Sequence, residues 1–441
     1  MATPATIYQS IVEELLRFKS ISTDPAYQGE MKATAKWLVE LFRQHGFQAR
    51  MVENYGNPIV VASYLVDKAA PTALIYGHYD VQPAVLEEGW DSDPFTLTKR
   101  GDRLYGRGVI DNKGQVGVHI ASVFALIASG NLTQNVTFMI EGDEETGSSL
   151  LGTFVREQST LLKADYVVVS DGEISGGQPV IERGYRGSFN ATLTIKTSTT
   201  DLHSGMYGGA VPSASQEMIS LLNQLVAPDG SIRIPSWIDD VPTIDPQALA
   251  DHARLPFSEE EFQRITGVKQ RFSSNGLDFC SQTTLQPSIV VTGVQSGYVG
   301  VGYRNSVPAT AQAKINFRLA PGQDPQRLLQ TLQVYLSDLL PSYVDWTLET
   351  DEPSAGIEIS LDEPVIQEAQ AILTTIYGQE PLRKFVGGTI PIVSDYAQVL
   401  KVPQVLIPLA NEDCAMHAAN ENFQLDHLER GLAFSEAFFS R

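Results

Sequence analysis

The 441-residue chain contains only two cysteines, Cys280 and Cys414, which lie far apart in the sequence. Two cysteines form neither a disulfide framework nor a thiolate zinc site, so a reducing, cytoplasmic compartment is the simplest expectation. The sequence also has no apolar run close to the ~20 residues that span a bilayer. It has no basic start followed by an apolar stretch, so we expect neither a signal peptide nor a membrane partner.

Positive charge is scarce as well. The chain has 31 basic and 52 acidic residues, which give a net charge of −21 with histidine neutral. Such a chain repels phosphate backbones and anionic lipids, so nucleic acid is a poor partner. Bound cations would offset part of the negative charge. The rest of the composition is typical of a globular enzyme, and the length suggests two or three domains.

The two ends of the chain alternate helical patterns with continuous apolar runs. Helical spacing predicts helices over residues 7–18, 31–45 and 114–128. Four apolar runs have the length of strands: Ala73–Tyr76, Val136–Ile140, Tyr166–Val169 and Val402–Leu409. Continuous apolar strands separated by helices predict an α/β fold with a mixed, mainly parallel sheet flanked by helices.

The pattern changes after Arg183. Residues 188–196 and 311–319 alternate as half-exposed strands do, and residues 324–340 form an amphipathic helical pattern. We therefore predict a smaller α+β domain over residues 186–360. It is inserted into a discontinuous domain of residues 1–185 and 361–441.

Acidic residues and histidines follow the end of an apolar run in five places, namely the four runs above and the short run Gly108–Ile110. They are His78 with Asp80, Asp111, Glu144 with Glu145, Asp171, and His417. In open α/β sheets ligands bind beyond the carboxyl ends of the strands, so a parallel sheet would gather these side chains at one edge. Carboxylates gathered without a counter-charge repel one another. Divalent cations would resolve that conflict.

A ligand set made of the two histidines and three of these carboxylates, with no cysteine, suits zinc, and also manganese or cobalt. A carboxylate shared by two ions ~3.5–4 Å apart is the usual basis of a two-metal hydrolase. Adjacent Glu144 and Glu145 point in different directions, so one can bind metal while the other faces a metal-bound water. Asp80 could accept the second ring N–H of His78. Taken singly, each residue could instead be a helix cap or a turn former.

Several ordered motifs carry a family resemblance that extends nearly end to end. They are residues 77–83, 89–95, 104–108, 111–114, 141–148, 201–205 and 387–391, followed by His417. The chain resembles the carnosinase and cytosolic non-specific dipeptidase branch of a large family of two-metal exopeptidases, aminoacylases and related deacylases. The resemblance implies a zinc-exopeptidase type of fold, in which the inserted domain acts as a lid and mediates homodimer formation.

The resemblance also implies roles for the metal-binding residues. Asp111 would bridge two divalent ions, with His78 and Asp171 completing one site and Glu145 and His417 the other. Glu144 would take a proton from the bridging water and pass it to the leaving amine. The peptide bond after Asp111 would be cis. Asn112 stands where relatives usually have a second aspartate, which puts any charge role at that position in doubt.

The resemblance assigns the substrate contacts largely to the inserted domain. His203 would stabilise the oxyanion, across the dimer interface in dimeric relatives. Arg318 would bind a free carboxylate together with Gly388 and Thr389, and Asn305 would add a polar contact. On the residues alone, His203 could instead cap a turn, Arg318 could be a surface cation, and the glycine pair could form only a turn.

These residues predict an enzyme that hydrolyses the amide bond of dipeptides or small peptides bearing a free carboxylate. An N-acyl-amino-acid deacylase is the alternative, because the family uses one metal centre for both reactions. A non-catalytic metal-binding relative is a third interpretation. The presence of Glu144 and of all five expected ligands argues against it.

Overall fold

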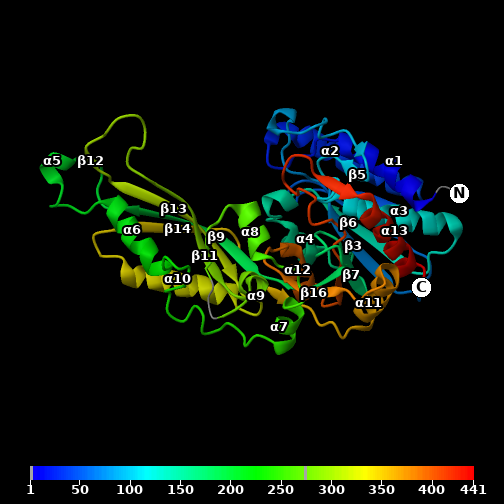
Figure 1. Cartoon of the computed structure of the whole chain (residues 1–441). Coiled ribbons are helices and arrows are strands. Elements are labelled where there is room, and N and C mark those ends of the chain that lie inside the picture. The colour runs from blue at the N-terminus through cyan, green and yellow to red at the C-terminus, as the bar shows by residue number, and fades with distance from the viewer. Residues whose placement is uncertain (1–2, 273–275) are drawn as a thin grey trace.

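The computed structural model describes residues 3–272 and 276–441. Figure 1 shows two bodies side by side, one built from both ends of the chain and one from its middle. Each body has its own hydrophobic core among the described residues. No helix in those residues is both long and apolar enough to cross a membrane.

The larger body is organised around a six-stranded sheet. Its strands, in spatial order, are β1 (Gln48–Val52), β2 (Ile59–Tyr64), β6 (Asn135–Glu141), β3 (Thr72–His78), β7 (Tyr166–Val169) and β17 (Gln404–Leu406). The last four are parallel, and β1 and β2 add an antiparallel edge. The predicted mixed, mainly parallel sheet is therefore confirmed. The expected strand at 402–409 is shorter than predicted, because Pro403 and Pro408 flank it and lack donor N–H groups.

Helices cover both faces of this sheet, which explains why its central strands are buried and largely apolar. Neighbouring residues of β6 point to opposite faces. The Phe138 ring packs 5.0 Å from the Phe42 ring of α2, while the Met139 sulfur accepts a hydrogen bond from Tyr396 of α12. The helices of this body are α1 (Pro4–Arg17), α2 (Gln28–Gln44), α3 (Lys113–Ser129), α4 (Leu151–Glu157), α11 (Pro364–Tyr377), α12 (Pro391–Val399) and α13 (Leu425–Phe439).

Two small sheets accompany the main one. One contains β15 (Ile357–Glu358), β8 (Val180–Tyr185) and β16 (Leu382–Val386). The other contains β18 (Asn422–Gln424), β5 (Arg103–Tyr105) and β4 (Thr98–Arg100). Because β18 follows the loop of His417 and β5 precedes the loop of Asp111, the second sheet brings these two loops together.

The smaller body is a four-stranded antiparallel sheet with helices packed on it. Its strands, in spatial order, are β11 (Ser288–Ser296), β13 (Thr310–Leu319), β9 (Gly187–Lys196) and β14 (Asp345–Thr350). Helices α6 (Ala214–Leu225) and α10 (Pro325–Leu339) lie over the sheet. At the far tip of Figure 1, β10 (Leu202–His203) pairs with β12 (Ser306–Val307) beside α5 (Ser204–Tyr207).

The chain crosses between the two bodies twice, and the two crossings lie against each other. The first runs from β8 into β9 and the second from β14 into β15. The backbone groups of Ser188 and Ser354 exchange two hydrogen bonds of 3.0 and 2.9 Å. A Cβ on Gly356 would lie 2.8 Å from the backbone nitrogen of Gly187, so the approach requires glycine. The domain limits at 185/186 and 360/361 stay a prediction.

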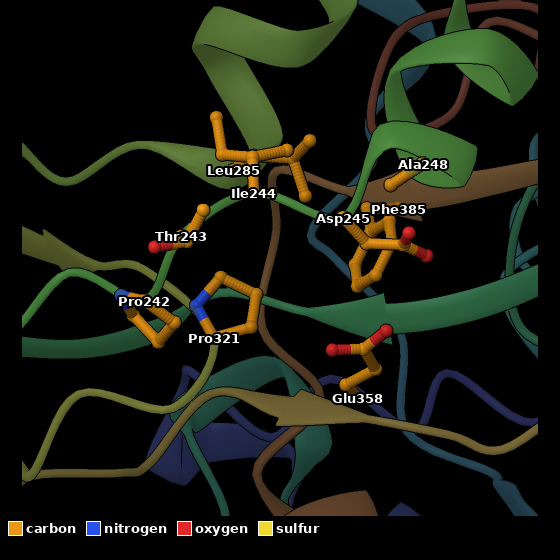
Figure 2. Close-up of a pocket in the computed structure, with 9 residues that line it drawn as sticks. All are labelled: Pro242, Thr243, Ile244, Asp245, Ala248, Leu285, Pro321, Glu358 and Phe385. Atoms are coloured by element: carbon orange, nitrogen blue, oxygen red, sulfur yellow. The ribbon is translucent and has the colours of Figure 1, made fainter.

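A small pocket lies beside this junction (Figure 2). Helices α7 (Pro246–His252) and α9 (Phe279–Leu285) border it, and α8 (Glu259–Thr266) follows α7 in the chain. Its lining residues are Pro242, Thr243, Ile244, Asp245, Ala248, Leu285, Pro321, Glu358 and Phe385. None of the residues predicted to act on substrate or metal is among them.

Candidate metal centre

The five predicted ligands meet at the carboxyl edge of the parallel strands. His78 ends β3, Glu145 lies in the short 3-10 turn that follows β6, and Asp171 follows β7. The loops before α3 and β18 supply Asp111 and His417. Among the described residues, two groups place one ligand atom per residue within 4.8 Å of each other: His78 with Asp111 and Asp171, and Asp111 with Glu145 and His417.

Asp111 belongs to both groups and offers one oxygen to each. Its Oδ1 lies 2.9 Å from His78 Nε2, and its Oδ2 lies 2.7 Å from His417 Nε2. Burial alone would raise the pKa of Asp111, but its close contacts with His417 and His78 outweigh burial and hold this pKa below its usual range. The hydrogen bond to Asp111 also raises the pKa of His417 to about 9. Asp111 is therefore an anion placed between two cation positions.

Two buried ligand atoms support the fit to metal ions. Glu145 Oε1 and His78 Nε2 are buried, and within the part of the chain that the structure describes neither has a partner in hydrogen-bond geometry, although His78 Nε2 lies 2.9 Å from Asp111 Oδ1. Buried polar atoms without partners are costly, and a bound cation would satisfy both. Nitrogen and oxygen donors without sulfur suit zinc, manganese or cobalt.

Asp80 lies behind the first group and touches two parts of the centre. His78 Nδ1 lies 3.0 Å from the Asp80 backbone carbonyl and 3.3 Å from its carboxylate Oδ1. The same carboxylate accepts the backbone N–H groups of Glu144 and Glu145 at 3.3 and 3.0 Å. Asp80 thus fixes the orientation of His78 and the turn that carries the glutamate pair.

Glu144 faces the cleft without joining either ligand group of the described residues. Burial, the largest effect, and the charges of Asp111, Glu141 and Asp80 together raise the pKa of the Glu144 carboxyl to about 8, against the opposing charge of His78. Such a carboxyl is suited to carry a proton near neutral pH.

The Asp111–Asn112 peptide bond is cis, as the resemblance implies. The Asn112 side-chain amide donates to the Ser170 carbonyl at 2.7 Å and to Asp171 Oδ1 at 3.0 Å. An aspartate at this position would present only acceptors to Asp171 unless it were protonated. Asn112 therefore positions Asp171 without adding charge.

Two of the three expected carboxylate-binding residues, Arg318 and Thr389, line the same cleft as the glutamate pair. Glu144, Glu145, Arg318 and Thr389 all contribute to its wall. Arg318 Nη1 donates to Thr389 Oγ1 at 2.9 Å, and this hydroxyl donates to the Arg186 carbonyl at 2.7 Å. Arg318 is half-buried and held in place, which is unlike a free surface cation. Gly388 is exposed in the same loop as Thr389.

His203 and Asn305 lie elsewhere in this chain. They are exposed neighbours at the tip of the smaller body, where the Ser204 N–H donates to the Asn305 carbonyl at 3.0 Å (Figure 1). His203 Nδ1 accepts from the Gly205 N–H at 3.1 Å, so it caps the first turn of α5. Of the described residues, those lining the cleft include neither His203 nor Asn305.

Sequence reasoning did not identify Gln82 or Arg186. Gln82 Nε2 donates to Glu145 Oε2 at 2.6 Å. Arg186 donates through Nε to the Gly387 carbonyl at 2.9 Å, and burial, helped by the charge of Arg318, lowers its pKa to about 10. Two guanidinium groups close enough to repel one another favour an anion nearby. The position of Gln82, four residues after the predicted ligand His78, could have marked it as a neighbour of the metal centre.

The surroundings of Cys414 and His119 indicate structural rather than catalytic roles. Cys414 is buried, and burial, reinforced by its contact with Glu173, raises the pKa of its thiol, which disfavours a nucleophilic thiolate. His119 lies in the core between the hydroxyls of Ser170 and Ser435, at 2.9 and 3.0 Å. Burial lowers the pKa of His119 to about 4, so it is neutral.

Comparison with known proteins defines the class. The profile of Peptidase family M20/M25/M40 matches residues 74–441, which is most of the chain. The chain therefore belongs to this family, and it is a hydrolase of the metallopeptidase class.

Individual relatives agree in sequence and in structure. Human Beta-Ala-His dipeptidase is 28% identical over 389 residues, which cover 87% of this chain and 77% of that protein. The Cys-Gly metallodipeptidase of Saccharomyces cerevisiae is 27% identical over 451 residues, covering 97% and 94%. An M20 family metallo-carboxypeptidase from Sulfolobus solfataricus superimposes with a TM-score of 0.89 at 27% identity, covering 98% of both chains. Human carnosine dipeptidase 1 gives a TM-score of 0.81 at 25% identity, covering 98% and 96%.

Proposed function

We propose that this enzyme hydrolyses the amide bond of dipeptides or small peptides that end in a free carboxylate. One observation carries the proposal. A single cleft is lined by Glu144 and by Glu145 of one candidate metal group, and also by Arg318, which is hydrogen-bonded to Thr389. A substrate that spans the cleft would place its carboxylate at the arginine and its amide bond at the glutamate.

The ligand groups would hold two divalent ions, His78 and Asp171 contributing with Asp111 to one and Glu145 and His417 with Asp111 to the other. The donor types match zinc best. Such ions polarise a carbonyl and make water a stronger nucleophile at neutral pH. Glu144 accepts the proton of the attacking water and delivers it to the leaving amine. Arg318 binds the substrate carboxylate through its planar guanidinium, and Thr389 and Gly388 complete that subsite.

Names of relatives support the peptide class. The similar proteins include a Beta-Ala-His dipeptidase, Cys-Gly metallodipeptidases and a metallo-carboxypeptidase. An N-acyl-amino-acid deacylase remains the second candidate, because Arg318 would bind the carboxylate of an N-acyl amino acid equally well. Retention of Glu144 and all five candidate ligands argues against a non-catalytic relative.

We also propose that two copies form a homodimer through the inserted domain, with His203 and Asn305 completing the partner's active site. His203 pairs with β12, and β12 and α5 lie at the far tip of the smaller body in Figure 1, away from β3 and β7. Next to it, the side chains of Val299, Val301 and Tyr303 are almost fully exposed, at 95%, 100% and 99%. Exposed apolar side chains of this kind are typical of an interaction surface. The two free cysteines fit a cytoplasmic location.

Activity assays on metal-stripped and reloaded enzyme test the function. Exhaustive chelation should abolish hydrolysis of a dipeptide panel while circular dichroism keeps most of its signal, because the ligands lie on a preformed sheet edge. Zinc, manganese or cobalt should restore activity. A matched panel of N-acyl amino acids separates peptidase from deacylase. Full activity in verified metal-free protein would exclude the proposed chemistry.

A further inference from the structure

A buried carboxylate, Glu421, lies four residues after His417 and is completely shielded from solvent. Its Oε1 accepts the backbone N–H groups of Gly108, Ile110 and Asp111 at 3.1, 2.8 and 3.1 Å. Its Oε2 accepts from Gly108 N at 3.0 Å and from Arg107 Nη1 at 2.7 Å. One side chain therefore binds three peptide groups of a single short loop.

That loop carries the residue common to both candidate metal groups. Asp111 donates its own N–H to Glu421, while its side chain reaches His78 and His417. The loop conformation is tightly constrained, since Gly108 has a φ of +88° and a Cβ there would lie 2.8 Å from Val81. The carboxylate of Glu421 thus sets where the Asp111 backbone, and with it the shared ligand, is placed.

Glu421 also belongs to the segment that supplies His417. The His417 backbone is left-handed, with a φ of +61°, which is uncommon for a residue with a side chain. The Glu421 backbone carbonyl accepts the Gly106 N–H at 3.1 Å. Contacts from both the backbone and the side chain of Glu421 therefore join the His417 loop to the Asp111 loop.

A purely stabilising ion pair would explain fewer of these contacts. Arg107 is 3% exposed and could pair with Glu421 alone. A buried ion pair is by itself weak evidence of stabilisation, because desolvation offsets the attraction. Four of the five carboxylate contacts go instead to peptide N–H groups of the Asp111 loop.

We propose that Glu421 is a positioning residue of the metal centre, which holds the loop of Asp111 against the loop of His417 so that both ligand groups form before metal binds. The inference rests on the proposed two-metal function. Glu421 touches neither substrate nor the ligand atoms, and it acts through the backbone of Asp111.

The test compares Glu421→Gln with a matched control, Asp413→Asn. Glutamine keeps the shape of the side chain, but it replaces one carboxylate oxygen by an NH₂ group. That group is a donor and would face the N–H donors that Glu421 now accepts. Asp413 lies in the same terminal loop and pairs with Arg103 at 2.7 Å, with its side chain 67% exposed. Zinc affinity of metal-stripped protein, measured by calorimetry, should fall ~10–100-fold in Glu421→Gln, as is common when an outer partner of a ligand is removed. It should stay within about threefold of wild type in Asp413→Asn, because exposed ion pairs contribute little.

Unchanged zinc affinity in folded Glu421→Gln would overturn the positioning role while leaving the proposed function intact. Wild-type protein that binds no zinc would overturn both. Hydrogen exchange on wild type covers the case in which the variant does not fold. The amides of Gly108, Ile110 and Asp111 should be protected with and without zinc, because Glu421 accepts them in either state. Fast exchange of these amides in folded, metal-stripped protein would contradict the inference.

Discussion

Replacing each of the adjacent glutamates by glutamine should separate proton transfer from metal binding. Glu145 belongs to the group with Asp111 and His417, and its Oε2 lies 3.4 Å from His417 Nε2. Glu144 belongs to neither group of the described residues, although both glutamates line the same cleft. Glutamine preserves size and shape, so each substitution removes only the charge and the ability to accept a proton.

The two variants should differ in kind. General acid–base groups contribute ~10²–10⁴-fold, so Glu144→Gln should lower kcat at least ~100-fold, or about 2.7 kcal/mol at 1.36 kcal/mol per decade. It should still bind two ions per chain. Glu145→Gln replaces one of the three charged or ring ligands of its group by a neutral amide and should instead lower occupancy of that site, with activity recovering in part at high metal concentration.

Elemental analysis of both purified variants, combined with kcat at saturating dipeptide, measures this difference. Wild type and both variants are stripped, reloaded with zinc and freed of excess metal before analysis. The reasoning is refuted if Glu144→Gln loses an ion while Glu145→Gln retains two. It is also refuted if Glu144→Gln with full metal content keeps wild-type kcat.

Three further predictions follow from the site. Mixing Glu144→Ala with His203→Ala under subunit exchange should restore roughly 25% of wild-type activity if His203 acts across a dimer, since half of the dimers are hybrids with one intact site in two; no recovery would place both groups in one chain. Arg318→Met should reduce kcat/KM ~100-fold for free dipeptides, about 2.7 kcal/mol, but much less for C-terminal amides; equal losses would rule out carboxylate binding. Burial raises the pKa of Glu141 and Glu144 from 4.5 to about 8, so between these values the folded state binds more protons than the unfolded state. The free energy of unfolding of the metal-free protein should therefore fall as pH rises through that window, by up to ~1.4 kcal/mol per pH unit per group. Denaturant titrations at several pH values should show that this free energy depends less steeply on pH in Glu141→Gln.

Local patterns were sufficient to predict the sheet and its ligand edge. The run Tyr166–Val169 is β7 with the predicted bounds. A strand covered by helices on both faces buries every side chain, so it appears in the sequence as a continuous apolar run. His78 ends β3 and Asp171 follows β7. These two strands are parallel neighbours in the sheet, so the two side chains lie close together. The antiparallel strands β1 and β2 were not predicted. β1, at the edge, has no continuous apolar run to mark it, whereas β2 begins with the apolar run Ile59–Ala62, a signal that the sequence offered.

Contacts that depend on distant segments could not be read from local sequence. Glu421 lies more than 300 residues from the loop of Asp111, and the pairing of β18 with β5 brings them together. Arg186 likewise meets Gly387 only because β16 lies parallel to β8. Nothing near either residue in the sequence reveals the partner, whereas a metal ligand at a strand end is marked by its position.

The paired crossings between the two bodies have a mechanical consequence. Because Ser188 and Ser354 are hydrogen-bonded to each other, the smaller body is attached by a two-stranded ribbon and not by two independent linkers. A ribbon of this kind bends across its plane more easily than it shears, since shear would slide one strand past the other and break the pairing. The cleft should therefore open and close by rotation about a single axis. This rotation would move Arg318 toward or away from Glu144. Lengthening one crossing by a residue would shift the register and tilt that axis, even though every residue at both walls of the cleft stayed the same.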